Sequence, residues 1–501
     1  MKLKNCSCNK TIFSSDIHRF WPMALFYGII LQLISVLPTL NNFYCNSTTL
    51  GGNSPDITFA RTIEGLNSGG FPALIAAILF AVYVFQYLSK EKESYSIHAF
   101  PVTREGLFVS HYCAGFVLLM IPVILSILAL CLLGFVFGVT PSGAFAWGFV
   151  QFIIEHILFY NLACLVVMLT GNGGMALLIY MVLNGLFPGL YSLFQALRSL
   201  YIYGATDFTS NFSRISRLSP VVFFMKHYEI SYYDNMDQVV LALNAKDCVS
   251  VLLSLIPSAI MFLFAIYLYK KRNVETTGEF VVFPWAKEVF RIVFTICSSL
   301  LFTYIMYYIL LYNIVNRYSY SAQFPYILFL AIISTLLFYW LSNVILYRSI
   351  RVFKQTSLLR WGILMVIMVV FLIGTNRYTI SIDSVKYPYI SVRVMEYATD
   401  SDEDDPKNSS YNGNCEYYYK ISSNKLSDLE QFIKDRQNEI QHQPVADRMD
   451  SIGRINIDVY SGETTKNNTG GSFSYPITED NKDIIYQQLD QLGTKEKVLT
   501  P

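Results

Sequence analysis

Nine apolar stretches decide what this chain can fold into. A helix needs about 20 apolar residues to cross the hydrocarbon core of a bilayer. With 53% hydrophobic and only 15% charged residues, the 501-residue chain is too apolar for an ordinary globular protein. We therefore predict a polytopic α-helical membrane protein with about nine transmembrane helices. The apolar stretches are 21–40, 71–88, 107–133, 145–169, 175–197, 249–269, 289–312, 325–347 and 358–375.

The distribution of Lys and Arg among the loops predicts the orientation in the membrane. Cytoplasmic loops of membrane proteins carry the excess of these residues. An N-terminus in the cytoplasm puts most loop cations on that side, and nine spans then place the C-terminal region outside. We predict a multi-pass protein of the cell membrane that does not bind nucleic acid, because no basic block is long enough. The cytoplasmic groups include Lys2, Lys4 and Lys10, then Lys90, Lys92 and Arg104, and then Lys270, Lys271 and Arg272.

The last 126 residues or so have a different pattern. From Tyr378 the sequence alternates apolar and polar residues, as half-buried strands do. Asp and Glu exceed Lys and Arg in this region, whereas the reverse holds before it. Two strand–strand–helix patterns follow each other, which suggests a ββα repeat. We predict that residues 376–501 form an extracytoplasmic, soluble α+β domain.

The loop between the second and third apolar stretches is rich in charge. Its sequence, SKEKESYSIHAFPVTREGLF (Ser89–Phe108), places Pro101, Arg104 and Glu105 directly before a new apolar run. Proline fixes a backbone angle and stiffens the turn, and the charged side chains offer contacts to a soluble partner. The same residue types also suit a plain helix N-terminus, where early proline and acidic residues are favoured. The residues alone leave both interpretations open.

Within this loop, HAFPVTREGLF (98–108) resembles the His-Ser-Leu-Pro-Val-Lys/Thr-Arg segment of ABC-2-type ABC transporter permeases. Ala99 and Phe100 stand where that family commonly has Ser and Leu. In the family, this loop forms a coupling helix that docks on a separate ATPase subunit. The resemblance implies that the ATPase contact here consists of Ser94, His98, Pro101, Thr103, Arg104 and Glu105.

The resemblance also implies a domain plan and a set of partners. Residues 1–20 would be an amphipathic elbow helix, 21–269 the six-helix permease core, and 270–375 three further transmembrane helices. This plan is similar to that of larger Gram-positive permeases with a C-terminal extracytoplasmic domain. The partners would be an ABC ATPase subunit and a second copy of this permease, or a related one, in a lipid membrane. ATP and Mg would bind to the ATPase, with no cofactor on this chain.

Two ionisable residues lie within an apolar stretch. Glu155 and His156 fall about ten residues into the fourth predicted span. Ionisable groups at that depth are costly and mark a site that faces a cavity or a partner. The alternative is that Glu155 makes a polar contact with a neighbouring helix, which would only orient the packing. Both interpretations stay open, the functional one being substrate translocation or coupling through a dimer cavity.

Sequence motifs for other activities are absent. The chain has no G-x-x-x-x-G-K-[ST] phosphate loop and no H-E-x-x-H zinc motif. We predict no metal site and no enzymatic activity on this chain, but the permease subunit of an ABC transporter, more consistent with an exporter. The alternative is a membrane-anchored sensor or scaffold whose outer domain binds an envelope ligand. An intramembrane enzyme and a secondary transporter fit less well.

Overall fold

The computed structural model divides into two compact units. The first unit comprises residues 1–187 and 216–289, and the second comprises 188–215 and 290–501. Each unit is described by itself below. The structure describes residues 9–48, 54–67, 70–201, 218–227, 231–235, 238–242, 245–311, 320–347, 349–350, 355–376, 389–396, 415–421, 425–442, 453–460 and 472–498.

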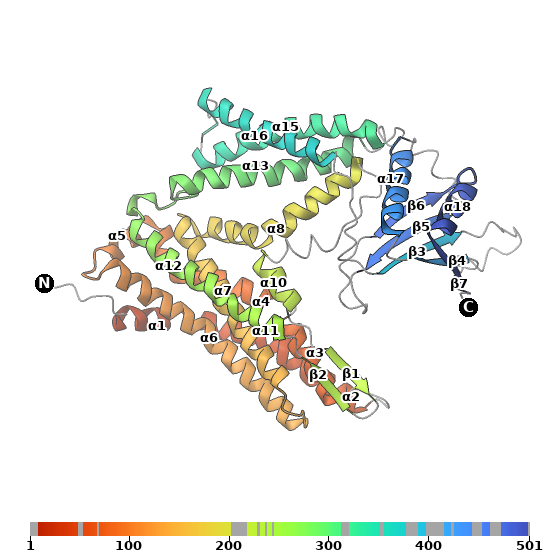
Figure 1. The fold of residues 1–501 in the computed structure, drawn as a ribbon. Coiled ribbons are helices and arrows are strands. Elements are labelled where there is room, and N and C mark those ends of the chain that lie inside the picture. Colours follow the sequence, from red (N-terminus) through yellow and green to blue (C-terminus); the bar gives the residue numbers. More distant parts are fainter. Residues whose placement is uncertain are drawn as a thin grey trace, which may run out of the picture. The chain divides into compact units, whose positions relative to one another are not determined.

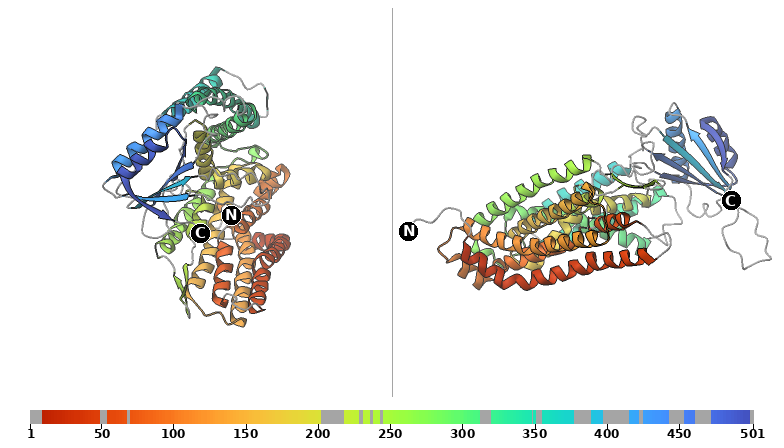
Figure 2. Two further views of the ribbon diagram at one scale, coloured as in Figure 1. Left: turned by 90° about the vertical axis from the view of Figure 1, so that its right-hand side faces the viewer. Right: turned by 90° about the horizontal axis from the view of Figure 1, so that it is seen from below.

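The first unit is a helical bundle (Figure 1). Figure 2 shows its helices running side by side, and among them α1 packs along α6. The elements are α1 (Lys10–Leu31), the π-helix η1 (Gln32–Val36), α2 (Leu37–Thr48), α3 (Pro55–Asn67), α4 (Phe71–Val84), η2 (Gln86–Ser89), α5 (Glu91–His98), α6 (Arg104–Val136), α7 (Gly143–Leu169), α8 (Gly173–Tyr201), α10 (Pro220–His227), β1 (Ser231–Asn235), β2 (Gln238–Ala242), α11 (Ala245–Leu253), α12 (Leu255–Lys271), η3 (Val274–Thr276) and α13 (Pro284–Met306). The helices α8 and α13 continue into the second unit.

The helices of the described residues confirm a polytopic helical membrane protein. Seven of them are long and apolar enough to cross a bilayer. The pair α3 and α4, bent by 41°, adds an eighth if it counts as one span. The ninth predicted stretch lies in α16 (Gln355–Asn376), whose apolar part, Leu358–Gly374, is shorter.

The start of α1 differs from the predicted elbow helix. Asn9 caps the helix through its side chain, which accepts a hydrogen bond from the Thr11 amide at 3.0 Å. From Lys10 the helix then continues without a break through Pro22 into the first span. Residues 10–20 are therefore the first turns of α1 rather than a separate helix, and residues 1–8 lie outside the described residues.

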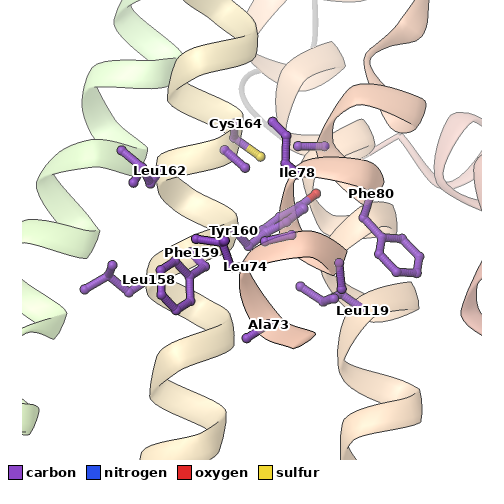
Figure 3. Close-up of a cluster of buried hydrophobic side chains, with 14 of the residues drawn as sticks. Ala73, Leu74, Ile78, Phe80, Leu119, Leu158, Phe159, Tyr160, Leu162 and Cys164 are labelled. Carbon is purple, nitrogen blue, oxygen red and sulfur yellow. The ribbon is translucent and has the colours of Figure 1, made fainter. Parts of the chain in front are cut away.

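The core of the first unit forms around Tyr160 (Figure 3). The ring of Tyr160 is fully buried, and its hydroxyl donates a hydrogen bond to the Tyr112 carbonyl oxygen at 3.1 Å. A Cβ atom added at Gly115 would lie 2.3 Å from that hydroxyl oxygen and 3.0 Å from Val84. Glycine at position 115 therefore lets α6 approach α7 closely. The surrounding apolar side chains include Leu74, Ile78, Phe80, Leu119, Leu158 and Cys164.

The second unit contains a helical part with its own buried cluster. Its helices are the ends of α8 and α13, the π-helix η4 (Tyr307–Leu311), α15 (Tyr320–Tyr347) and α16. Hydroxyl groups cross-link these apolar helices, since Thr303 and Ser334 lie 2.8 Å apart through their side-chain oxygens. Such interhelical hydrogen bonds are characteristic of membrane bundles. The buried cluster consists of Leu197, Leu200, Tyr201, Leu300, Tyr307, Ile327, Ala331, Met368 and Leu372.

The C-terminal region forms an antiparallel sheet covered by two helices. The strand order is β6-β5-β3-β4-β7, and α17 and α18 pack on the sheet through one shared apolar cluster (Figure 1). Val392 and Val394 of β3 lie beside Ile457 and Ile455 of β5 on the buried face. The chain runs strand, strand, helix twice before β7. The elements are β3 (Tyr389–Glu396), β4 (Cys415–Ile421), α17 (Leu426–His442), β5 (Gly453–Tyr460), β6 (Ser472–Ile477), α18 (Lys482–Leu492) and β7 (Gly493–Val498).

The close contact at Gly115 gives the first testable prediction. We expect Gly115→Ala to destabilise the protein by about 1–3 kcal/mol, because the added methyl group overlaps the Tyr160 hydroxyl. The melting temperature of the purified chain in a neutral detergent measures the effect. Gly185→Ala is the matched control, since this helical glycine has nothing within 4 Å of an added Cβ. Equal melting temperatures for the two variants would contradict the prediction.

Candidate functional site

The first predicted cytoplasmic loop folds into the short helix α5 and a turn. Glu91 and Glu93 occupy the first turn of α5 and His98 the last, an order that complements the helix dipole. After the turn with Pro101, Thr103 starts α6 as its N-cap residue. The Thr103 hydroxyl oxygen accepts a hydrogen bond from the Gly106 amide at 3.1 Å. Thr103 therefore acts as a helix cap, as the plain helix-start interpretation expects.

Arg104 and Glu105 contact the end of α12 within the same unit. The Arg104 guanidinium donates hydrogen bonds to the carbonyl oxygens of Lys270, at 3.1 Å, and Arg272, at 2.8 Å. Glu105 forms an ion pair with the Lys270 ammonium group. The last carbonyls of a helix carry partial negative charge, so a guanidinium is well placed there. These two residues hold the start of α6 against the end of α12.

Arg272 is the most connected side chain in this region. Its guanidinium is buried, with 5% of the residue exposed, and it donates to four backbone carbonyl oxygens. Three of these belong to Val167, Met168 and Thr170 at the end of α7, at 2.8 to 3.3 Å. The fourth is the Leu88 carbonyl in η2, at 3.0 Å. We call Arg272 with these four carbonyls the arginine clamp.

The Arg272 guanidinium of the arginine clamp stays charged at neutral pH. Burial lowers the pKa of the Arg272 guanidinium to about 10, and nearby Tyr87 and Tyr269 oppose that effect. A cation that is removed from water needs hydrogen-bond partners, and the carbonyls at helix ends supply them. The clamp therefore joins the ends of α7 and η2 to the residue that follows α12.

The turn between α7 and α8 pairs with the segment after η3. The Gly171 amide donates to the Glu279 carbonyl oxygen at 3.0 Å, and the Gly278 amide donates to the Gly171 carbonyl oxygen at 2.8 Å. A Cβ atom at Gly171 would lie 2.6 Å from two backbone oxygens, those of Thr276 and Glu279. Only glycine fits such a close approach of two backbones. Two backbone hydrogen bonds and a close backbone contact therefore fix this turn to the segment after η3.

Ser94 and His98 face inward from α5. Ser94 is buried, and the His98 Nδ1 atom lies 2.7 Å from the Ser94 carbonyl oxygen. The His98 ring stacks on Tyr269 of α12 at 5.9 Å between ring centres, with its Nε2 atom 3.4 Å from the Tyr269 hydroxyl. That hydroxyl lies 2.8 Å from the hydroxyl of Tyr87 in η2. Ser94 is thus buried and His98 packs from α5 on α12, while their contact with an ATPase subunit stays a prediction.

The exposed side of the loop carries aromatic residues. Tyr95 is 51% exposed and Phe100 is 54% exposed, and Lys92, Ser96 and Pro101 are exposed around them. We call these five residues the α5 tip. Exposed aromatic side chains on a supported helix are the usual anchors of a protein interface. In the sequence, Phe100 stands out only as a departure from the family segment and Tyr95 does not stand out; the signal for Tyr95 is its helical spacing with Lys92 and Ser96.

Glu155 and His156 belong to a separate buried network. The His156 Nε2 atom lies 2.7 Å from the Tyr27 hydroxyl in α1, and its Nδ1 atom lies 2.7 Å from the Phe152 carbonyl oxygen. One Glu155 carboxyl oxygen accepts a hydrogen bond from Gln151 at 3.3 Å. The other has no hydrogen-bond partner among the residues that the structure describes.

The second Glu155 oxygen faces the start of α4. A Cβ atom at Gly70, which precedes α4, would lie 3.9 Å from this oxygen. Gly70 has no side chain to cap the first amides of α4, and these amides carry partial positive charge. The carboxyl group therefore complements the start of α4, just after the bend between α3 and α4. The distance along the axis of α7 from Glu155 to Val167, whose carbonyl belongs to the arginine clamp, is about 18 Å at 1.5 Å per residue.

Comparisons with known proteins add no family to these observations. No protein-family model matches the chain, and no curated protein matches it. Within the described ranges, no group of three or more His, Cys, Asp and Glu side chains is placed to hold a metal ion.

The arginine clamp gives the second prediction. We expect Arg272→Met to destabilise the chain by about 2–4 kcal/mol, because several carbonyls lose a charged donor. Arg272→Lys restores only part of the loss, since one ammonium group cannot reach four carbonyls in the geometry of a guanidinium. Thermal unfolding in detergent measures both. Lys271→Met removes the same charge from an exposed neighbour and serves as the control; an equal loss in that variant would refute a specific clamp.

The position of His98 gives a third prediction, on pH. Burial lowers the pKa of His98, and the charges of Arg104, Arg272 and His111 add to the effect, against the Ser94 carbonyl contact. The unfolded chain then binds a proton on this histidine at a higher pH than the folded chain does. Stability from His98 is therefore present above about pH 6.5 and declines as the pH falls below it.

The test compares melting temperatures at pH 7.5 and pH 5.5. We expect the acid-induced decrease to be smaller in His98→Asn than in the unchanged chain. Tyr87 of η2 and Tyr269 of α12 also face the ring, but neither titrates in this range. His18→Asn, at an exposed histidine, is the control and should keep the full decrease. A full decrease in His98→Asn as well would contradict the assignment.

Proposed function

We propose that this protein is the membrane-spanning permease subunit of an ABC transporter that works as an exporter. A separate ATPase subunit would supply ATP hydrolysis, and a second copy of this chain or a related permease would complete the pathway. In this proposal the nine stretches all cross the cell membrane, with the N-terminus in the cytoplasm and residues 376–501 outside. Residues 21–269 would form the permease core and 270–375 the added spans.

The α5 tip is the observation that carries this proposal. An ATPase subunit that transmits a conformational change to a membrane protein needs a protruding and rigid contact surface. The α5 tip supplies exposed aromatic side chains; Ser94 is buried on the other side of α5, and the His98 ring stacks on Tyr269 of α12. Farther along the chain, Arg104 and Glu105 tie the start of α6 to the same helix. A displacement of the α5 tip by the ATPase subunit would therefore move several helix ends together.

The proposal changes the roles of the residues in the loop. The ATPase contact would be made by Tyr95, Phe100 and Pro101 of the α5 tip. His98, Thr103, Arg104 and Glu105 would be positioning residues that keep the tip in place. The clamp at Arg272 and the turn at Gly171 would pass the movement to α4 and α7. A rigid-body shift of packed helices is one of the known ways in which such changes spread.

The fourth prediction tests the α5 tip. We expect Phe100→Ser to weaken co-purification of the ATPase subunit about tenfold or more, since an interface anchor is lost. The melting temperature of the permease should stay unchanged, because Phe100 is exposed. Phe135→Ser is the matched control, as Phe135 is 85% exposed at the opposite end of α6. Unaltered ATPase binding in Phe100→Ser would count against this docking surface.

A second candidate function is a membrane-anchored sensor or scaffold. The observation in its favour is the C-terminal sheet, which has its own apolar cluster and thus its own stable framework. Such a protein would need no ATPase. Failure of any ATPase subunit to co-purify with the unchanged chain, together with ligand binding by the full chain that depends on residues 389–498, would favour this function.

A further inference from the structure

Two buried side-chain oxygens in α7 have no hydrogen to accept. Glu155 and Gln151, one turn apart on this helix, are both fully buried. The Gln151 side-chain nitrogen donates to one Glu155 carboxyl oxygen at 3.3 Å and to the Phe224 carbonyl oxygen of α10 at 3.5 Å. The second Glu155 oxygen and the Gln151 side-chain oxygen have no hydrogen-bond partner within the described ranges. Buried polar atoms without a partner are costly, so this pair of acceptors needs an explanation.

The titratable neighbours of Glu155 do not supply the missing hydrogen. In the described part of the chain these neighbours are Tyr27 of α1 and His156 of α7. The His156 Nε2 atom lies 2.7 Å from the Tyr27 hydroxyl, and its Nδ1 atom lies 2.7 Å from the Phe152 carbonyl oxygen. The hydrogens of both side chains are therefore used within this pair and at the Phe152 carbonyl. No Lys or Arg side chain among the described residues donates to either Glu155 oxygen.

The start of α4 is close to Glu155 but does not replace a charged partner. A Cβ atom at Gly70 would lie 3.9 Å from the second Glu155 oxygen. A helix start carries a partial positive charge of about half a unit. Pro72 in the first turn of α4 has no amide hydrogen, which leaves fewer donors there than usual. Because an unpaired buried charge costs far more than a helix dipole returns, a neutral carboxylic acid is favoured.

A carboxylic acid and an amide at this spacing complement each other. Glu155 and Gln151 are four residues apart, so their side chains are neighbours on one face of α7. The carbonyl oxygen of the acid accepts from the amide N–H, and the O–H of the acid can donate to the amide oxygen. One proton on Glu155 would thus satisfy both oxygens that have no partner. A proton also needs no cavity to hold it.

We propose that Glu155 is a proton-binding site inside a membrane-spanning helix, neutral at physiological pH and paired with Gln151. The proton comes from water and returns to it; on release the O–H bond breaks and its electron pair stays on the carboxylate. The carboxylate would then accept hydrogen bonds from the first amides of α4, those of Phe71 and Ala73, which have no partner within the helix.

Proton release would thereby draw the start of α4 towards α7. This is the place where α3 and α4 meet at an angle of 41°. A bent helix pair can change its angle more easily than a continuous helix can, so the proton would control the bend. This site goes beyond the proposed transport function and needs no ATPase.

Infrared spectroscopy of the full chain in a neutral detergent tests the site at about pH 7. A protonated carboxyl group has a carbonyl band that a carboxylate lacks, and we expect Glu155→Gln to remove such a band. Glu279→Gln is the matched control, because the Glu279 carboxylate pairs with the Lys287 ammonium group at 2.8 Å and should contribute no such band. A Glu155→Gln spectrum that keeps the whole band would show that Glu155 is ionised and would overturn the proposal.

A second variant tests the pairing with Gln151. Gln151→Leu keeps a side chain of similar size and removes the amide. We expect the Glu155 band to remain and to move to higher frequency, because the carboxyl group loses its hydrogen bonds to the amide. A band that does not move, or that disappears, would overturn the shared proton.

Proton binding also fixes the sign of a stability change. At neutral pH the unfolded chain has an ionised Glu155, since the ordinary pKa of glutamate is about 4.3. The folded chain would hold one proton more, so this site lowers stability as the pH rises. We expect Glu155→Gln to raise the melting temperature at pH 7.5 and to raise it less at pH 5.5. An equal difference at both pH values, or a larger gain at pH 5.5, would overturn the proposal.

Discussion

The buried guanidinium of Arg272 is the interaction on which the predicted cytoplasmic end of the first unit depends. Helix ends leave carbonyl groups without intrahelical partners, and in an apolar protein these groups are costly to bury. Arg272 satisfies carbonyls of α7 and η2 with one side chain. Arg104 does the same for the end of α12, and its own carbonyl partners include that of Arg272. The helix ends are thus joined by charged hydrogen bonds in addition to apolar packing.

This arrangement has a consequence for movement. Apolar contacts between helices in a membrane allow sliding, because lipid tails compete with them on nearly equal terms. Helices that are joined by hydrogen bonds between a cation and several carbonyls cannot slide past one another without breaking these bonds. The end of the bundle near α5 can therefore move as one body. Near Glu155, α7 makes polar contacts to Tyr27 of α1 through His156 and to the Phe224 carbonyl oxygen of α10 through Gln151. The bend between α3 and α4 lies beside Glu155.

The sequence predicts the helices well because apolar length is a local property. Apart from the breaks at Phe85 and Ser254, the described residues of the nine apolar stretches are helical, and the alternation around Val392 and Ile455 places both on the buried face of the sheet. The clamp was not predictable. Arg272 looked like one more loop cation, and its partners are backbone carbonyls that no sequence pattern marks. Likewise, His98 turns inward because its ring stacks on Tyr269 of α12, and the π-helix at residues 32–36 has no sequence signal beyond Pro38.

The central claim is that the α5 tip meets an ATPase subunit, and a disulfide cross-link tests it most directly. Ser96→Cys, in a chain whose nine native cysteines are replaced, would be combined with single cysteines in a surface groove of the co-expressed ATPase. Ser96 is exposed on α5 and takes no part in the clamp. The account predicts a cross-link whose yield changes when ATP is added. Absence of any cross-link from Ser96, with an active ATPase bound to the membrane, would contradict it.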